Sequence, residues 1–87
     1  GLLTIDLRAD VVLASAFAGA VEARLPAPGT CAGAQVTVKK TDPSANPVTV
    51  TVAGGNGPDN AVQTLSAQYA AVTALSNGAA WHILARA

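Results

Sequence analysis

The chain has 87 residues with five basic and five acidic side chains, so its formal net charge is zero. Because nucleic-acid binding requires clustered Lys and Arg, these balanced and scattered charges argue against a nucleic-acid partner. Hydrophobic residues make up 51% of the chain and charged residues 11%, against about 25% charged residues in an ordinary soluble domain. Such a small, charge-poor domain would expose apolar patches of the kind that mark interaction surfaces, which predicts a subunit of an assembly.

The N-terminal third allows two interpretations. The Ala-rich run from 9 to 23 is compatible with a helix capped by Asp10. The end of the same run alternates, however, with Val21, Ala23 and Leu25 on one side and two charged residues on the other, which is typical of a strand. We therefore expect strands at about 3–7, 10–14 and 20–25, the last one ended by a proline-rich turn.

Apolar and polar residues alternate regularly in the middle of the chain. Valines and polar residues alternate over 35–40 and again over 47–53, so each segment is predicted to be a strand with one buried face. The residues between them include Asp42, Pro43, Asn46 and Pro47, a combination that interrupts a strand ladder and favours a turn. The pattern predicts a hairpin formed by these two strands.

The C-terminal part predicts three more strands. A Gly-rich loop at 54–60 precedes a short strand at about 61–65, and a further strand is expected from Tyr69 to Leu75. Asn77-Gly78 is a strong signal for a hairpin with a type I′ turn, which leads into the final strand. The Tyr69–Leu75 strand is apolar on both faces, which indicates burial on both sides. Core or subunit-interface candidates are therefore Val72, Tyr69, Leu75, Trp81 and Ile83.

The predicted fold class is thus all-β. About seven short strands separated by turn signals indicate a small antiparallel sandwich or barrel-like domain that occupies residues 1–87. The charge-free run between Asp59 and Arg86 is long enough to cross a membrane, but its many polar residues argue against a transmembrane helix. The N-terminus has no basic region of the kind that begins a signal peptide.

Several short motifs resemble one family of proteins. They are Lys39-Lys40-Thr41-Asp42, Ser44-Ala45-Asn46, the Val/Thr strand 48–52, Gln68-Tyr69, Val72-Thr73, Ser76-Asn77-Gly78 and Trp81. In this order they resemble a small all-β module found in virion proteins of tailed bacteriophages, including head-decoration proteins, tail fibres and spikes. The resemblance covers about residues 20–84, and it departs from the family at Pro58-Asp59-Asn60, where the module usually has Ile-Asp-Gly.

The resemblance implies a function and partners. The module often forms threefold-symmetric trimers, so a homotrimer is expected, with Trp81 packed in the core rather than stacked on a sugar. Because the chain has no visible shaft or anchoring domain, the resemblance favours a head-decoration (cement) subunit on the outer surface of the capsid, bound to the major capsid protein. Residues 1–10 are then a possible docking arm, with Leu2, Leu3 and Ile5 as docking candidates. The alternative is a receptor- or glycan-binding module of a tail fibre or spike.

No pattern for catalysis or cofactor binding is visible. The five acidic residues are separated from one another along the chain, whereas polysaccharide cleavage requires paired carboxylates. Cys31 and His82 lack a third orienting residue, so we expect a small buried filler and an outward strand residue. One Cys and one His do not make a structural zinc site, which needs four ligands, and a single Cys allows no intrachain disulfide. The expectation is a non-enzymatic protein without metal or cofactor.

Overall fold

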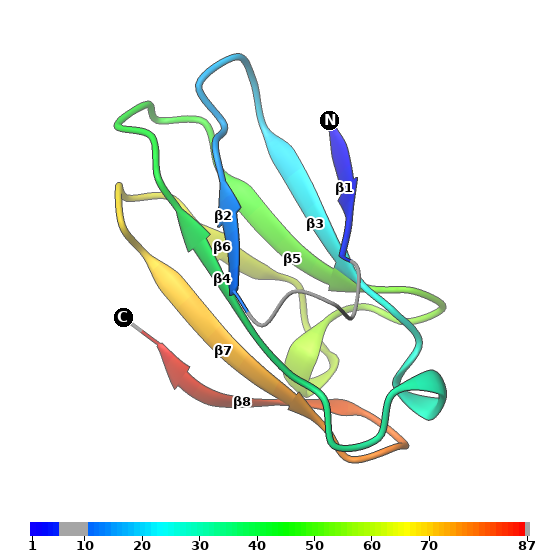
Figure 1. Ribbon diagram of the computed structural model, residues 1–87. Helices are drawn as coiled ribbons and strands as arrows, with labels where there is room; N and C mark the ends of the chain where they lie inside the picture. Colours follow the sequence, from blue (N-terminus) through cyan, green and yellow to red (C-terminus); the bar gives the residue numbers. More distant parts are fainter. Residues whose placement is uncertain (6–10, 87) are drawn as a thin grey trace.

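The computed structural model describes residues 1–5 and 11–86. Two four-stranded sheets pack face to face, and no α-helix occurs in these residues (Figure 1). This confirms the all-β class and the sandwich. The strands are β1 (Leu2–Thr4), β2 (Val11–Ala14), β3 (Val21–Leu25), β4 (Gln35–Lys40), β5 (Val48–Val52), β6 (Gln63–Leu65), β7 (Ala71–Ser76) and β8 (Trp81–Arg86), with short 3₁₀ turns η1 (Pro28–Thr30) and η2 (Pro58–Asn60).

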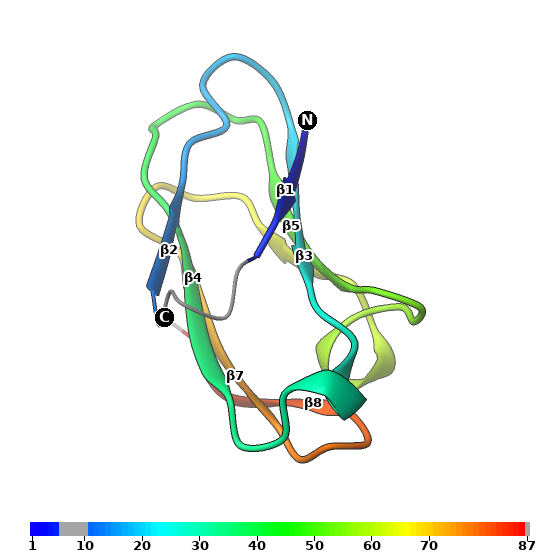
Figure 2. The ribbon, with the colours of Figure 1, turned by 45° about the vertical axis from the view of Figure 1, so that its right-hand side comes forward.

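The strand order shows how the chain builds the two layers. One sheet has the order β1-β3-β5-β6 and the other β2-β4-β7-β8, so the first five strands alternate between the sheets (Figure 2). As a result β1, β3 and β5 are parallel to one another, as are β2 and β4. Only the pairs β4–β7, β5–β6 and β7–β8 are antiparallel. The prediction of an antiparallel sandwich is therefore wrong for the N-terminal half.

The predicted hairpin of 35–40 with 47–53 is also wrong. Both strands exist, but β4 and β5 belong to different sheets, and their valines face each other across the core. Val36 and Val38 of β4 and Val48 and Val50 of β5 are all buried. Alternation reports that one face of a strand is buried, and two strands from facing sheets show the same alternation as two paired strands. The turn residues 41–47 therefore connect the layers.

The N-terminal third is formed by strands. The described residues show β2 at Val11–Ala14 and β3 at Val21–Leu25, as predicted for 10–14 and 20–25. The helix alternative is excluded for the described residues, while its proposed cap at Asp10 lies outside them. The first strand ends at Thr4, and the remainder of the expected 3–7 segment beyond Ile5 also lies outside the described residues.

The C-terminal hairpin is confirmed with a different turn. β7 and β8 are antiparallel neighbours, and residues Asn77–Ala80 connect them. Gly78 has a φ of 91°, but Asn77 is not in the positive-φ region, so the turn is not type I′. Instead the Asn77 side-chain carbonyl accepts hydrogen bonds from the backbone N–H groups of Ala79 and Ala80, both at 2.9 Å. Asn contributes here through its side chain.

The core consists mainly of small and β-branched side chains from both sheets. Its largest member is Trp81, which is 1% exposed and donates its indole N–H to the Pro26 carbonyl at 2.8 Å. This bond satisfies the one polar group of the indole and connects the start of β8 to the end of β3. The inner face of β3 thus packs on the core through Ala23 and Leu25, and Glu22 and Arg24 lie on the outer face.

Candidate functional sites

The Lys-Lys-Thr-Asp motif forms a buried ion pair. Lys40 is fully buried, and its ammonium group lies 2.8 Å from Asp42 Oδ2. The same ammonium donates to the backbone carbonyls of Asp42 and Ser44, each at 2.9 Å. Asp42 Oδ1 accepts a hydrogen bond from the Ala16 N–H at 2.7 Å. This network joins the connection between the sheets to the chain just after β2, so the motif builds the fold.

The charge state of Asp42 depends on these contacts. Burial by itself would raise the pKa of the Asp42 carboxyl. The hydrogen bonds from Lys40, from Ser44 and from the Ala16 N–H stabilise the carboxylate and hold that pKa well below its usual range. Asp42 therefore stays ionised at neutral pH and compensates the buried Lys40 charge. A residue bound in this way is not free to act as a catalytic base.

The five core or interface candidates divide into three groups, which are buried, exposed and partly buried. Val72 and Trp81 are each 1% exposed and belong to the core of a single subunit. Tyr69 lies in the turn before β7 with a φ of 70° and is 60% exposed, because β7 begins two residues later than predicted. Leu75 and Ile83 are partly buried. The face of β7 toward the core therefore carries Val72, whereas Leu75 points outward.

The docking candidates lie on and beside β1. Leu2 is 55% exposed and Leu3 38% exposed, but Ile5 is buried with 4% exposed, so Ile5 fills the core instead of offering a docking surface. Two further exposed apolar residues, Val11 and Leu13 on β2, were not among the predicted docking residues and are 56% and 66% exposed. They belong to a predicted strand, and period-2 alternation does not identify them because β2 is apolar throughout.

These residues stand on the terminal strands of two different sheets, and the strand register places Leu2 on the outer face of one sheet and Leu13 on the outer face of the other. At the opposite edge β6 and β8 meet, where Arg86 donates a hydrogen bond to Gln63 and Asp59 of η2 accepts one from the Ile83 N–H at 3.2 Å. We call β6, β8 and η2 the closed edge. The strands β1 and β2 end their sheets on the other side, and we call them the open edge. The open edge exposes Leu2, Leu3, Val11 and Leu13.

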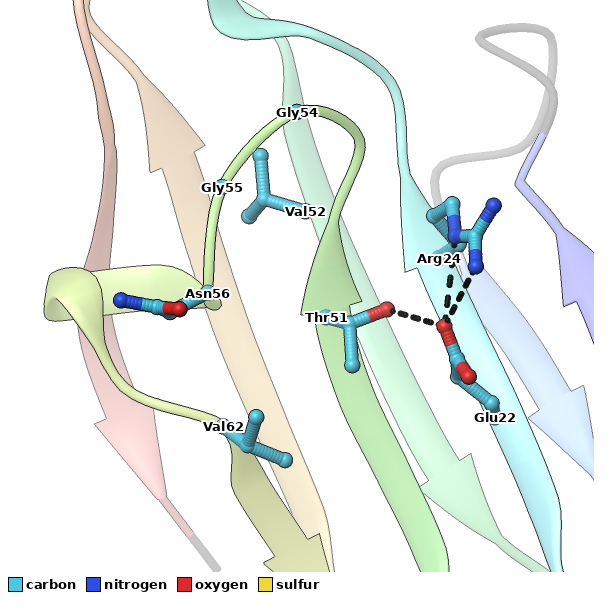
Figure 3. A pocket seen from close by; sticks show the side chains of 8 residues that line it. All are labelled: Glu22, Arg24, Thr51, Val52, Gly54, Gly55, Asn56 and Val62. Atoms are coloured by element: carbon cyan, nitrogen blue, oxygen red, sulfur yellow. Dashed lines mark hydrogen bonds and ion pairs between the residues drawn. The ribbon is translucent and has the colours of Figure 1, made fainter.

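A shallow pocket lies on the outer face of the β1-β3-β5-β6 sheet. It has a volume of about 580 Å³, and Figure 3 shows the side chains that line it. Glu22 and Arg24 come from β3 and Thr51 from β5, and the remaining lining residues are Val52, Gly54, Gly55, Asn56 and Val62. Glu22 and Arg24 were not predicted as site residues, although residues i and i+2 of a strand share a face.

Polar contacts hold the floor of this pocket in place. Glu22 Oε2 accepts a hydrogen bond from the Thr51 hydroxyl at 2.9 Å and two from Arg24, at 3.2 Å from Nε and 3.0 Å from Nη2 (Figure 3). The Thr51 hydrogen bond, followed by those of Arg24, lowers the pKa of the Glu22 carboxyl. The pocket thus presents a fixed carboxylate beside a fixed guanidinium.

Cys31 and His82 have separate surroundings. Cys31 is buried, and its thiol lies 3.6 Å from the Ala27 carbonyl. His82 is exposed, at 3.1 Å from the Asn77 amide and 3.7 Å from the Asp59 carboxylate. Within residues 1–5 and 11–86, no group of three or more His, Cys, Asp and Glu side chains is placed to hold a metal ion. None of the helical segments in this part of the chain is long and apolar enough to span a membrane.

The chain was compared with known proteins at the level of sequence. No protein-family model matches it, and no curated protein matches it either.

Proposed function

We propose that this chain is a non-enzymatic structural subunit of a tailed-phage virion, in the form of a head-decoration protein on the outside of the capsid. The proposal rests on the resemblance of residues 20–84 to the phage module. It also explains why a domain of this size carries unpaired apolar side chains at one edge. The proposed partners are two further copies of the chain, as a homotrimer, and the major capsid protein.

One structural observation supports the proposal most directly. The open edge exposes four large apolar side chains on two short strands, and the free backbone groups of an edge strand can pair with another chain. Apolar exposure of this kind marks a protein–protein contact. A partner strand that pairs with β1 or with β2 would extend that sheet and cover apolar side chains of the strand it joins.

In this proposal the subunit stabilises the capsid shell by binding to it, without a chemical reaction. A subunit that binds the assembled shell but not its separated or ruptured parts stabilises the shell by mass action. No reacting group is required, and the buried Lys40–Asp42 pair serves only to keep the subunit folded. A receptor- or glycan-binding module of a tail fibre or spike is the second candidate, and the polar pocket beside Glu22 and Arg24 is the observation that favours it.

Immunogold electron microscopy of phage particles from the source, with an antibody raised against this chain, tests the proposal. Label spread over the heads is the expected result. Label confined to the tail would replace the decoration role by the fibre or spike role. Particles without any label would contradict both forms of the proposal, whatever the fold.

A further inference from the structure

The chain contains two Asn-Gly pairs, Asn56-Gly57 and Asn77-Gly78, in two different loops. Such a pair can close a ring, because the backbone nitrogen of the glycine can attack the side-chain carbonyl carbon of the asparagine. Glycine allows this attack more readily than other residues, since it has no Cβ beside the attacking nitrogen. The two pairs have the same chemistry, so their surroundings determine which of them reacts.

Hydrogen bonds hold Asn77 in the turn between β7 and β8. Its side-chain carbonyl accepts the N–H groups of Ala79 and Ala80, both at 2.9 Å, and its own N–H donates to the Ala80 carbonyl at 3.1 Å. Its amide nitrogen also lies 3.1 Å from His82 Nε2. The side chain would have to leave these partners before its carbonyl carbon could meet the Gly78 nitrogen, which opposes ring closure at this pair.

The attacking nitrogen of Gly78 is bonded as well. Its N–H donates to the Ser76 hydroxyl at 3.2 Å, and that hydroxyl donates its own proton to the Pro28 carbonyl at 3.0 Å. The Ser76 oxygen therefore presents only lone pairs to the Gly78 nitrogen. Ring closure requires the glycine N–H to lose its proton, and at Gly78 the resulting negative charge would lie against an acceptor. This contact also opposes the reaction.

Asn56-Gly57 has fewer restraints in the loop between β5 and η2 (Figure 3). Asn56 is exposed, and its amide nitrogen makes one side-chain hydrogen bond, to Asn60 Oδ1 at 3.3 Å. With the described residues, neither the Asn56 side-chain carbonyl nor the Gly57 N–H forms a hydrogen bond. Gly57 is buried, but its nitrogen attacks the residue directly before it. The exposed glycines Gly54 and Gly55 give that residue freedom to turn.

We propose that Asn56 is a site of spontaneous deamidation in the folded protein and that Asn77 is protected from the same reaction. The Gly57 nitrogen loses its proton to hydroxide and bonds to Asn56 Cγ. The bond between Cγ and Nδ2 breaks, and Nδ2 leaves with a proton from water as ammonia. The succinimide ring then takes up one water and opens to an aspartyl or an isoaspartyl residue. The inference is independent of the decoration role.

Conversion at Asn56 would change the loop in two ways. The chain becomes one unit more negative than its formal net charge of zero, and the new carboxylate stands in the lining of the pocket beside β3 and β5. The isoaspartyl form also adds one atom to the backbone before Gly57, which is packed so closely on the Ala61 carbonyl that a Cβ has no room. Because Asp59 in the same loop accepts the Ile83 N–H, this form should loosen the closed edge.

The test incubates the complete chain at one pH and temperature, folded in buffer and, in parallel, unfolded in guanidinium chloride. Chymotryptic cleavage after Tyr69 separates the two sites, and mass spectrometry follows the replacement of the amide by a carboxyl group in each peptide. In the folded chain Asn56 should convert at least about tenfold faster than Asn77, because several hydrogen bonds must break at Asn77. In guanidinium chloride, where these bonds are absent, the two rates should agree within about threefold.

Two variants assign the charge change to one residue. Isoelectric focusing of the folded wild type should show an acidic form that increases with time. Asn56→Gln should remove most of this form, because glutamine keeps the amide but closes a larger ring more slowly. Asn77→Gln should retain it, and thermal unfolding of both variants shows that they are folded. The purified isoaspartyl form should have a Tm at least about 4 °C below that of the unmodified chain.

Three results would overturn the proposal. The first is conversion of Asn77 in the folded chain at a rate equal to that of Asn56. The second is a rate at Asn56 that is more than about tenfold lower in the folded chain than in guanidinium chloride, which would mean that the fold protects this site too. The third is an acidic form that appears equally in the wild type and in Asn56→Gln. An unchanged Tm of the isoaspartyl form would overturn the inferred effect on the closed edge.

Discussion

The two side edges of the sandwich differ in their side chains: hydrogen bonds link the sheets at one edge, and apolar side chains are exposed at the other. At the closed edge, side chains bridge the two sheets: Arg86 on β8 bonds to Gln63 on β6, and Asp59 of η2 accepts the N–H of Ile83. At the open edge, β1 and β2 expose apolar side chains, and the described residues show no side-chain hydrogen bond between these strands. Natural proteins usually protect edge strands against pairing with other chains. Within the described residues, this contrast supports the proposal that the protein associates through the open edge.

The open edge is nevertheless well anchored at one end. The buried Lys40–Asp42 pair holds the residue Ala16 by a 2.7 Å hydrogen bond, and the Thr41 N–H donates to the carbonyl of Ala14 at 2.9 Å. The polar contacts that stabilise β2 therefore come from the connection between the layers. The closed edge, by contrast, depends on contacts between the edge strands themselves.

The largest effect on stability is expected for Asp42→Ala. The substitution leaves the Lys40 ammonium group buried without its counter-charge and removes the partner of the Ala16 N–H, and breaking a buried pair is strongly destabilising. Tm, measured by circular dichroism, should fall by more than about 10 °C. The matched control is Lys39→Met, because Lys39 is the neighbouring lysine but lies over the Tyr69 ring at 5.2 Å near the surface. Equal shifts in the two variants would contradict this role of the buried pair.

The pH dependence sharpens this result. The pKa of the Asp42 carboxyl is lowered in the folded state, so its contribution to stability is complete above its unfolded value of about 4. The contribution is lost as the pH falls below that value, because the unfolded state then binds a proton that the folded state does not. The gap in urea midpoint between the wild type and Asp42→Ala should therefore narrow from pH 7 to pH 3. If the difference in urea midpoint widens toward pH 3, the pKa of Asp42 is not lowered in the folded state.

An intermediate effect is expected for Gly57→Ala at the closed edge. A Cβ on Gly57 would collide with the backbone carbonyl of Ala61, so the loop that contains η2, between these two residues, would have to change its conformation. The free energy of unfolding should fall by about 1–3 kcal/mol, measured by urea denaturation. Gly55→Ala is the control, since its Cβ would meet only Val52 at 4.0 Å. If both variants unfold at the same urea concentration, η2 does not fix the closed edge.

The smallest effect on stability is expected at the open edge. Leu2→Lys and Leu13→Lys change exposed side chains, so each should alter the free energy of unfolding by less than about 0.5 kcal/mol. The same substitutions should abolish self-association or capsid binding, because a charge would be buried in the contact. Sedimentation of the variants with and without capsids measures this. Thr64→Lys on the exposed face of β6 is the control, and an equal loss of binding there would remove the distinction between the edges.

Local patterns predicted most strands but not their partners. The alternation of Val48, Val50 and Val52 located β5, and Asn77-Gly78 located the β7–β8 hairpin, because each signal depends on residues close together in the chain. Alternation places Lys40 on the same face as Val36 and Val38, but nothing in the local sequence shows that Asp42 pairs with it in the interior and that the chain then crosses from β4 to β5 in the other sheet. Similarly, the pocket requires Thr51 beside Glu22, which becomes visible only when the parallel register of β3 and β5 is known.

The alternation of the chain between the two sheets has a consequence for folding. β1 pairs with β3, and β4 pairs with β7, although β5 and β6 lie between β4 and β7 in the sequence. Most of the sandwich therefore consists of contacts between distant parts of the sequence. Such topologies fold slowly, because loop-closure entropy is lost before the contacts form. During synthesis the apolar β1 and β2 emerge before the strands with which they pair, and β2 stays without a sheet until β4 has emerged. These two strands are then available to other chains while folding is incomplete, so the expression level and temperature should affect the yield of soluble protein.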